Sequence, residues 1–239
     1  MVERSSAWFR SFQKTLEEAS NSGHTVPASW IPILPVDIEI QRTYLQDLED
    51  DDTNRIDAIV VYDNASTANV PSKFRDLPLI SLTDTKTPHD LLKLISLGVD
   101  IVSATFITTA SDAGIVLDFQ FPTNQIKGSP RPLGTDMWSE QFAADTSPLQ
   151  ADCDCYTCKS HHKAFIRHLL SVKEMLAWVL LQIHNHHVMA KFFTGVRKSI
   201  ASGNYELDVA VFGAAYTLDF PPFQGQGPRY VITDCPYIC

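Results

Sequence analysis

The sequence predicts an α/β fold, and three observations support this prediction. Four short apolar runs, at residues 30–35, 56–62, 77–82 and 99–104, alternate with segments in which apolar residues recur at helical spacing. This order is typical of a parallel sheet covered by helices. The 239 residues include 44% hydrophobic and 20% charged side chains, a composition that indicates one folded domain with or without a subdomain. No apolar run approaches the roughly 20 residues that cross a bilayer, so no transmembrane helix is expected.

The first elements follow from the spacing of apolar residues. Trp8, Phe12 and Leu16 lie four residues apart and predict a surface helix that packs this stripe against a core. Residues 38–48 return to helical spacing and predict a second helix between the first two strands.

An explicit helix start follows the third strand. Thr87 is placed to cap the helix, Pro88 occupies its first turn and Asp90 faces the positive end of the helix dipole. Gly98 is placed to cap the C-terminal end before the fourth strand begins. Residues 115–121 then alternate as a hairpin strand does.

Changes of composition divide the chain into four parts. A stripe of apolar residues predicts an amphipathic helix of about 25 residues with this stripe in the core, and residues 188–201 predict another helix. The stripe consists of Phe165, Leu169, Val172, Leu176, Val179 and Ile183. Prolines and glycines concentrate before and after these helices. The predicted parts are strand and helix units over 1–121, an irregular linker over 122–150, a helical subdomain over 151–203 and a C-terminal tail over 204–239.

Three of the five cysteines lie within six residues, at Cys153, Cys155 and Cys158. The N-terminus carries no secretory signal, which predicts the cytosol, where thiols stay reduced, and the cluster therefore indicates a metal site. Structural Zn²⁺ takes four ligands of this kind and leaves no open position for water. His184 is a candidate for the fourth ligand. Its competitors are His161, His162, His186 and His187.

The distance between the cysteines and His184 constrains the fold. His184 lies near the far end of the predicted helix, and a continuous helix of about 25 residues spans roughly 37 Å. Either this helix bends or breaks, or the cysteine loop lies back along it.

A wider motif surrounds the cysteines. Cys153-Asp154-Cys155-Tyr156-Thr157-Cys158 is followed by Arg167-His168-Leu169-Leu170, by Glu174-Met175-Leu176 and by His184-Asn185, with His184 26 residues after Cys158. This motif resembles the zinc signature of the tRNA-guanine transglycosylase family. The resemblance implies one structural Zn²⁺ held by Cys153, Cys155, Cys158 and His184. It also implies a (β/α)8 TIM barrel with a zinc-binding helical subdomain, of which this chain would hold the C-terminal half.

The same resemblance places the catalytic positions of the family on residues that lack the required chemistry. Members exchange guanine in tRNA through an aspartate that attacks the ribose, which needs a carboxylate nucleophile. The matching segment is Gly98-Val99-Asp100-Ile101-Val102-Ser103, in which Ser103 stands at the nucleophile position and Asp100 is expected to be structural. The glycine loop that surrounds the base is replaced by Tyr62-Asp63-Asn64-Ala65-Ser66, and a Gln-Gly-Gly turn by Pro35-Val36-Asp37.

This pattern resembles the non-catalytic subunits of the family, which form heterodimers with a catalytic queuine tRNA-ribosyltransferase subunit. The implied role is to support the exchange of guanine for queuine at the wobble position of tRNAs with GUN anticodons, in queuosine biosynthesis. Those subunits are longer at the N-terminus, so this chain is expected to be a shortened version. Two alternatives remain. One is an active transglycosylase that uses Asp100 or Asp118 as nucleophile, and the other is a truncated, non-functional fragment with exposed sheet edges.

Charge is distributed unevenly along the chain. Residues 1–150 carry 11 basic and 21 acidic side chains, whereas residues 151–239 carry 8 and 7. An anionic partner such as tRNA is therefore expected on the C-terminal part. The candidate phosphate contacts, for which the alternative role is solubility, are Lys159, Lys163, Arg167, Lys191, Arg197 and Lys198.

Location and the remaining cysteines complete the expectations. The resemblance implies a cytoplasmic protein with a peripheral position at the mitochondrial outer surface. Cys235 and Cys239 are expected to be free surface thiols.

Overall fold

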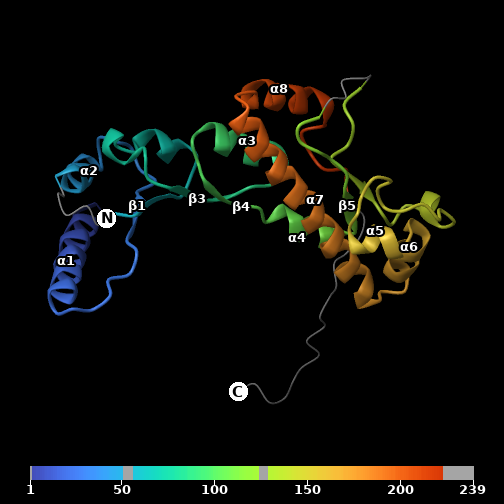
Figure 1. The fold of residues 1–239 in the computed structure, drawn as a ribbon, viewed down its shortest axis with the longest axis horizontal. Helices are drawn as coiled ribbons and strands as arrows, with labels where there is room; N and C mark the ends of the chain where they lie inside the picture. The colour runs from blue at the N-terminus through green and yellow to red at the C-terminus, as the bar shows by residue number, and fades with distance from the viewer. Residues whose placement is uncertain (1, 51–55, 124–128, 223–239) are drawn as a thin grey trace, which may run out of the picture. The chain divides into compact units, whose positions relative to one another are not determined.

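A parallel sheet forms the centre of the N-terminal part of the chain (Figure 1). The computed structural model describes residues 2–50, 56–123 and 129–222 and divides the chain into two units, Met1–Ala104 and Thr105–Cys239. The described part of the first unit holds four parallel strands in sequential order, which confirms the α/β class. They are β1 (Trp30–Ile33), β2 (Ala58–Val61), β3 (Leu79–Asp84) and β4 (Ile101–Ser103).

Helices supply the other side of the core of this first unit. Side chains from neighbouring strands and from helix α2 are fully buried together, including Ile31, Ile33, Ile59 and Leu48. Burial of this apolar surface is the main stabilising contribution to the unit. The helices are α1 (Val2–Asn21), α2 (Arg42–Glu49) and α3 (Pro88–Ser96), with short 3₁₀ turns η1 (Ala65–Asn69) and η2 (Ser72–Phe74).

The predicted start of α3 is confirmed. The Thr87 side chain accepts a hydrogen bond from the Asp90 backbone N–H at 3.3 Å, and the Asp90 carboxylate accepts one from the Thr87 N–H at 3.0 Å. These reciprocal bonds satisfy two backbone donors that the first turn of a helix leaves unpaired. Gly98 has a φ of 87°, the left-handed conformation that ends the helix.

The stripe predicted to pack α1 against the core is confirmed at Leu16 and wrong at Trp8. Phe9, Gln13 and Leu16 form the buried face, whereas Trp8 is 53% exposed and stacks on Phe12 with ring centroids 5.1 Å apart. Two aromatic rings that stack on the outer face of a helix show the same four-residue spacing as a buried stripe. Spacing alone therefore does not distinguish a stacked surface pair from a core-facing stripe.

The described part of the second unit is mainly helical, with one short antiparallel strand pair. Strands β5 (Ile115–Leu117) and β6 (Gly134–Asp136) pair antiparallel, which agrees with the expectation of a hairpin strand after residue 115. The helices are α4 (Phe106–Ala113), α5 (Tyr156–Ser160), α6 (Lys163–Ser171), α7 (Met175–Ala201) and α8 (Tyr205–Ala215). Helix α7 is the longest, shown in orange in Figure 1.

Regular structure occurs both in the segment predicted to be an irregular linker and in the predicted C-terminal tail. Residues 122–150 include β6 and the 3₁₀ turn η3 (Glu140–Phe142), and residues 204–239 include helix α8. Strand β6 spans only three residues and contains a glycine, so it shows no alternation of apolar and polar residues in the sequence. It forms because its backbone pairs with the edge of β5. Helix α8 buries Phe212 against the aromatic cluster of α7, a tertiary contact that the sequence does not display.

The predicted long helix is broken, and four of the six residues in its apolar stripe are exposed, whereas Leu169 is buried as predicted. Helix α6 ends at Ser171 and α7 begins at Met175, with Lys173 at a φ of 59° between them. Val172, Leu176, Val179 and Ile183 are exposed by 52, 45, 49 and 38%. Apolar residues occur on more than one side of α7, so the periodicity does not identify the buried face. That face instead carries Ala177, Trp178, Leu181, His184, Asn185 and Val188.

The C-terminal half of α7 packs in an aromatic cluster. Phe192 lies 5.6 Å from both Phe119 and Phe121 and 5.9 Å from Phe212, measured between ring centroids. Gly195 lies against the same segment, and a Cβ added to it would stand 1.7 Å from the Phe121 carbonyl oxygen. Within the described residues, no helix is both long and apolar enough to span a bilayer.

Candidate metal centre

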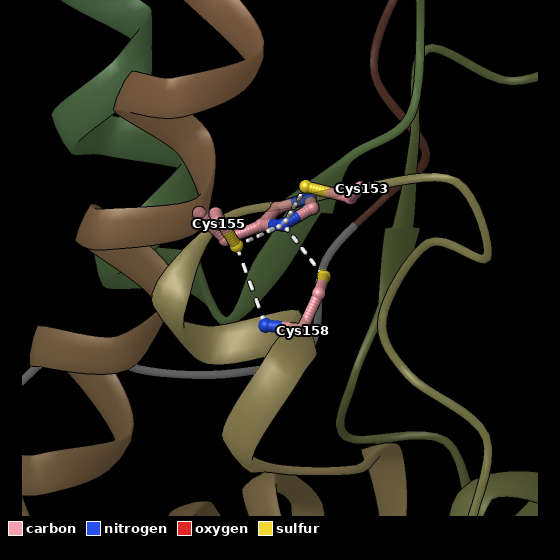
Figure 2. A group of neighbouring side chains, drawn as sticks. Cys153, Cys155 and Cys158 are labelled. Atoms are coloured by element: carbon pink, nitrogen blue, oxygen red, sulfur yellow. Dashed lines mark hydrogen bonds between the residues drawn. The ribbon is translucent and has the colours of Figure 1, made fainter.

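The cysteine loop is organised by its own backbone. Cys155 caps the N-terminus of α5, and its sulfur accepts a hydrogen bond from the Cys158 N–H at 3.3 Å. This bond turns the chain so that Cys158 follows Cys155 by one helical turn and presents its side chain next to it. Figure 2 shows the side chains of Cys153, Cys155 and Cys158 converging on one point.

His184 of α7 completes the cluster. Its Nδ1 atom lies 3.7 Å from the sulfur of Cys153, 3.5 Å from that of Cys155 and 3.3 Å from that of Cys158. A tetrahedral Zn²⁺ with Zn–S bonds of about 2.3 Å and a Zn–N bond of about 2.0 Å separates sulfur from nitrogen by about 3.5 Å. The four ligand atoms all lie within 4.8 Å of one another, so the donor set fits a tetrahedral zinc ion in type, number and spacing.

Both predicted arrangements contribute to bringing the cysteine loop close to His184. The helix breaks between α6 and α7, and the cysteine loop with α5 lies back against α7. The Thr157 hydroxyl, which is fully buried, donates to the Leu180 carbonyl at 2.8 Å and fixes α5 one turn before His184. Sequence reasoning missed Thr157 because a threonine between two cysteines gives no sign of its partner.

The four competing histidines have other positions. The His162 ring accepts the Phe165 N–H at 3.1 Å and caps α6, and the His161 ring stacks on Phe165 with centroids 5.0 Å apart. His187 contacts Asp154 through Nε2 at 2.8 Å, and His186 is exposed. His184 alone among these five side chains reaches the cysteine sulfurs.

Burial and mutual proximity control ionisation of the three thiols. Burial raises the pKa of the Cys153 thiol and raises the pKa of the Cys158 thiol to about 12. Burial also opposes ionisation of Cys155, but hydrogen bonds with His184 and with the Cys158 N–H outweigh it and lower the pKa of that thiol to about 6. The protein groups therefore favour a single thiolate at neutral pH. A bound divalent cation supplies the positive charge that allows all three to ionise.

The candidate phosphate contacts fall into two groups. Arg167 pairs with Glu140, Lys163 lies 3.3 Å from the Asp145 carboxylate and Lys191 lies 2.5 Å from that of Asp154. These three cations are engaged within the second unit. Lys159, Arg197 and Lys198 are exposed, and their side chains form no ion pair with the part of the chain that the structure describes.

Of the three candidate nucleophiles, Asp100 and Asp118 are engaged in structural hydrogen bonds and the Ser103 hydroxyl is not. Ser103 ends β4, its carbonyl oxygen accepts the Thr85 hydroxyl at 2.5 Å, and no described residue lies in hydrogen-bond contact with its own hydroxyl. The Asp100 carboxylate accepts the Leu79 N–H at 2.9 Å, which agrees with the structural role expected for it. The Asp118 carboxylate accepts bonds from Arg131 at 3.0 Å and from Gln150 at 3.1 Å.

The two segments expected to replace the base-binding loops of the family form local hydrogen bonds. Asp63 accepts bonds from the Ser66 N–H at 2.8 Å and the Ser66 hydroxyl at 2.7 Å, and the Val36 carbonyl accepts the Gln41 amide at 2.8 Å. Cys235 and Cys239 lie outside the described residues.

Comparison with known proteins places this geometry in a family context. A family model described as queuine tRNA-ribosyltransferase matches residues 1–217. The queuine tRNA-ribosyltransferase accessory subunit 2 of Schizosaccharomyces pombe is 36% identical over 232 residues, which cover 96% of this chain and 52% of that protein. The accessory subunit 2 of Drosophila pseudoobscura pseudoobscura is 36% identical over 116 residues, or 48% of this chain and 27% of its own length.

A bacterial protein shows similarity of the same strength. The queuine tRNA-ribosyltransferase of Dictyoglomus turgidum is 34% identical over 119 residues, which cover 50% of this chain and 28% of that protein. The chain thus spans about half the length of the Schizosaccharomyces pombe relative and about a quarter of the other two.

Proposed function

We propose, because this chain belongs to the queuine tRNA-ribosyltransferase family, that it is a non-catalytic subunit of such an enzyme. It pairs with a catalytic subunit as a heterodimer and supports the exchange of guanine for queuine at the wobble position of tRNAs with GUN anticodons. One observation carries the proposal: a complete Cys₃His ligand set stands in the same chain as a serine at the nucleophile position. The four parallel strands are then part of a (β/α)8 barrel, and α5 to α7 form its zinc-binding subdomain.

The metal in this proposal is one structural Zn²⁺. Cys153, Cys155, Cys158 and His184 supply four ligands, which leaves no position for a catalytic water. Bound zinc joins the cysteine loop to α7 and stabilises the packing of α5 on that helix.

The absence of catalysis in this proposal follows from the chemistry at the nucleophile position. A serine hydroxyl attacks only when a neighbouring base removes its proton, and no described residue forms a hydrogen bond with the Ser103 hydroxyl. The two alternative nucleophiles, Asp100 and Asp118, are held by backbone and side-chain donors. Because these bonds stabilise each carboxylate where it stands, they reduce its nucleophilic reactivity.

An exposed apolar stripe supports the pairing with a partner subunit. Val172, Met175, Leu176, Val179 and Ile183 follow one another along the end of α6 and the first turns of α7, each at least 38% exposed. Exposed apolar side chains that recur along a helix in this way are typical of a protein interface. The proposed catalytic subunit covers this stripe.

Three exposed cations support the contact with tRNA. Lys159, Arg197 and Lys198 are the candidates that remain without an ion pair in the described residues, and a phosphate backbone binds such side chains. The proposal keeps Lys163, Arg167 and Lys191 as secondary candidates, because tRNA would have to compete with their carboxylate partners.

The test combines purification with an exchange assay. The chain is co-expressed with a catalytic queuine tRNA-ribosyltransferase subunit, and complex formation, zinc content and incorporation of labelled guanine into tRNA are measured for the pair and for the chain alone. We expect one zinc per chain, a stable pair, and exchange only by the pair. The variant Leu176→Glu/Val179→Glu should lose the complex, whereas Leu207→Glu, at a side chain that is 65% exposed on α8, should keep it.

Other outcomes select the alternatives. Guanine exchange or a covalent RNA adduct formed by the chain alone would refute the non-catalytic role and return attention to Asp100 and Asp118. Zinc binding without pairing would identify a folded metal subdomain on a non-functional fragment. A peripheral position at the mitochondrial outer surface belongs to the same proposal, and fractionation of cells that express the tagged chain tests it.

A further inference from the structure

The edge of β5 that faces α7 is occupied by side chains instead of a neighbouring strand. Strand β5 pairs with β6 along its other edge, with Val116 opposite Thr135. In an antiparallel pair, the backbone groups of alternate residues point away from the partner, so Ile115 and Leu117 direct theirs toward α7. These groups are buried and need partners.

Asn185 supplies partners for two of these groups. Its side-chain oxygen accepts the Leu117 N–H at 2.9 Å, and its side-chain nitrogen donates to the Ile115 carbonyl at 2.9 Å. The same nitrogen donates to the Ser111 hydroxyl of α4 at 2.9 Å. The Asn185 amide therefore bonds to β5 much as the N–H and C=O of one residue in a parallel strand would, and it is fully buried.

His184 takes the remaining backbone group of Leu117. Its Nε2 atom lies 3.1 Å from the Leu117 carbonyl oxygen. Because a carbonyl oxygen only accepts, Nε2 carries a ring hydrogen, and Nδ1 is the ring nitrogen that faces the three sulfurs and is able to bind a metal ion between them. Leu117 thus receives both its bonds from two consecutive residues of α7.

We propose that Asn185 is a positioning residue for the metal ligand His184. The Asn185 amide fixes β5 against α7, and the Leu117 carbonyl, held in this way, sets the ring orientation and the hydrogen position of His184. This inference rests on the proposed zinc site and adds a residue that does not touch the metal. Groups that orient a metal-bound histidine change metal affinity by about 10- to 100-fold when they are removed.

Residues of similar size cannot replace the amide. A leucine at position 185 offers neither donor nor acceptor and leaves the Leu117 N–H and the Ile115 carbonyl unsatisfied. An aspartate keeps the acceptor for Leu117 but places a carboxylate oxygen against the Ile115 carbonyl oxygen, where two acceptors meet.

The experiment compares Asn185→Leu with Trp178→Phe in the full chain. Trp178 also lies on the buried face of α7, and its indole N–H donates to the Asp112 carbonyl at 3.0 Å, so its loss removes a similar tether without touching Leu117. Zinc affinity is measured by competition with a chromophoric chelator, and ligand geometry by the visible absorption of the Co²⁺-substituted protein. Thermal unfolding of the zinc-free variants reports the general loss of stability.

We expect Asn185→Leu to bind Zn²⁺ about 10- to 100-fold more weakly and to change the Co²⁺ spectrum. Trp178→Phe should lower thermal stability and keep both the affinity and the spectrum of the unchanged chain. An affinity of Asn185→Leu within about twofold of the unchanged chain, with the same Co²⁺ spectrum, would overturn the proposal. Equal weakening by both variants would overturn it too, because general destabilisation would then explain the effect.

A measurement on the unchanged chain covers the case in which Asn185→Leu does not fold. Hydrogen exchange of the Leu117 amide should slow when Zn²⁺ binds, because the same residue links Asn185 to the ligand, and ring ¹⁵N shifts should show the Nε2–H tautomer of His184. Exchange that does not respond to Zn²⁺ would overturn the positioning role. Failure of the unchanged chain to bind Zn²⁺ at all would instead refute the zinc site of the proposed function.

Discussion

Gly195 allows a sharp test of how α7 is packed. In a helix interior, replacement of glycine by alanine normally stabilises a protein by up to about 1 kcal/mol, because glycine loses more backbone entropy on folding. Gly195 should reverse this sign. An added Cβ would stand 1.7 Å from the Phe121 carbonyl oxygen and 2.6 Å from the Phe121 carbonyl carbon, both of which belong to the backbone.

The magnitude follows from the size of this overlap. A carbon and an oxygen that are not bonded stay roughly 3.5 Å apart at their optimal separation, so α7 and the segment around Phe121 would have to separate by well over 1 Å. The rings of Phe121 and Phe192 are packed together, and overfilling of such a core costs about 1–3 kcal/mol. We expect Gly195→Ala to lower the free energy of unfolding by about that amount.

Gly213 of α8 is the matched control, since an added Cβ there meets nothing within 4 Å. Gly213→Ala should be neutral or stabilising by up to about 1 kcal/mol. Thermal unfolding followed by circular dichroism compares the variants, and about 2–4 °C per kcal/mol is expected for a chain of this size. If Gly195→Ala melts at or above the temperature of Gly213→Ala, the close approach of α7 to Phe121 is refuted.

Three further outcomes follow from the structure. Thr157→Val should lower the free energy of unfolding by about 1 kcal/mol because the hydrogen bond to α7 is lost, whereas Thr157→Ser keeps the hydroxyl that forms this bond. Equal urea unfolding midpoints for Thr157→Val and the unchanged chain would contradict this role. Chelation of zinc should lower the unfolding temperature of the unchanged chain and leave Cys158→Ser unaffected, while Zn²⁺ at 100 times its dissociation constant should restore about 2.7 kcal/mol. Burial raises the pKa of Tyr44, so the neutral phenol stabilises the fold below the unfolded pKa of about 10 and this contribution declines at higher pH. Denaturation between pH 8 and 11 should show that decline in the unchanged chain and a weaker one in Tyr44→Phe.

Local sequence signals were sufficient to predict an element where its structure depends on contacts among its own residues. The cap of α3 is an example, because Thr87 and Asp90 bond to each other within four residues and need no distant partner. The parallel strands were also predictable, since apolar runs of this length between helical segments have few other stable arrangements. For the candidate metal centre, the clustered thiols pointed to the three cysteines, and the family motif pointed to His184 as the fourth residue that could bind the ion.

The faces of the helices were decided only by tertiary structure. Periodicity pointed to Leu176 and Val179 as core, but the structure exposes both and buries His184 and Asn185 on another side of α7. The buried backbone groups at the edge of β5 need polar partners, and His184 and Asn185 supply them. The side of α7 that carries these two residues therefore faces β5. Sequence alone therefore determined which residues are able to hold the metal. Which groups hold those residues in place was determined by long-range hydrogen bonding between elements almost 70 positions apart, a relation that no local pattern encodes.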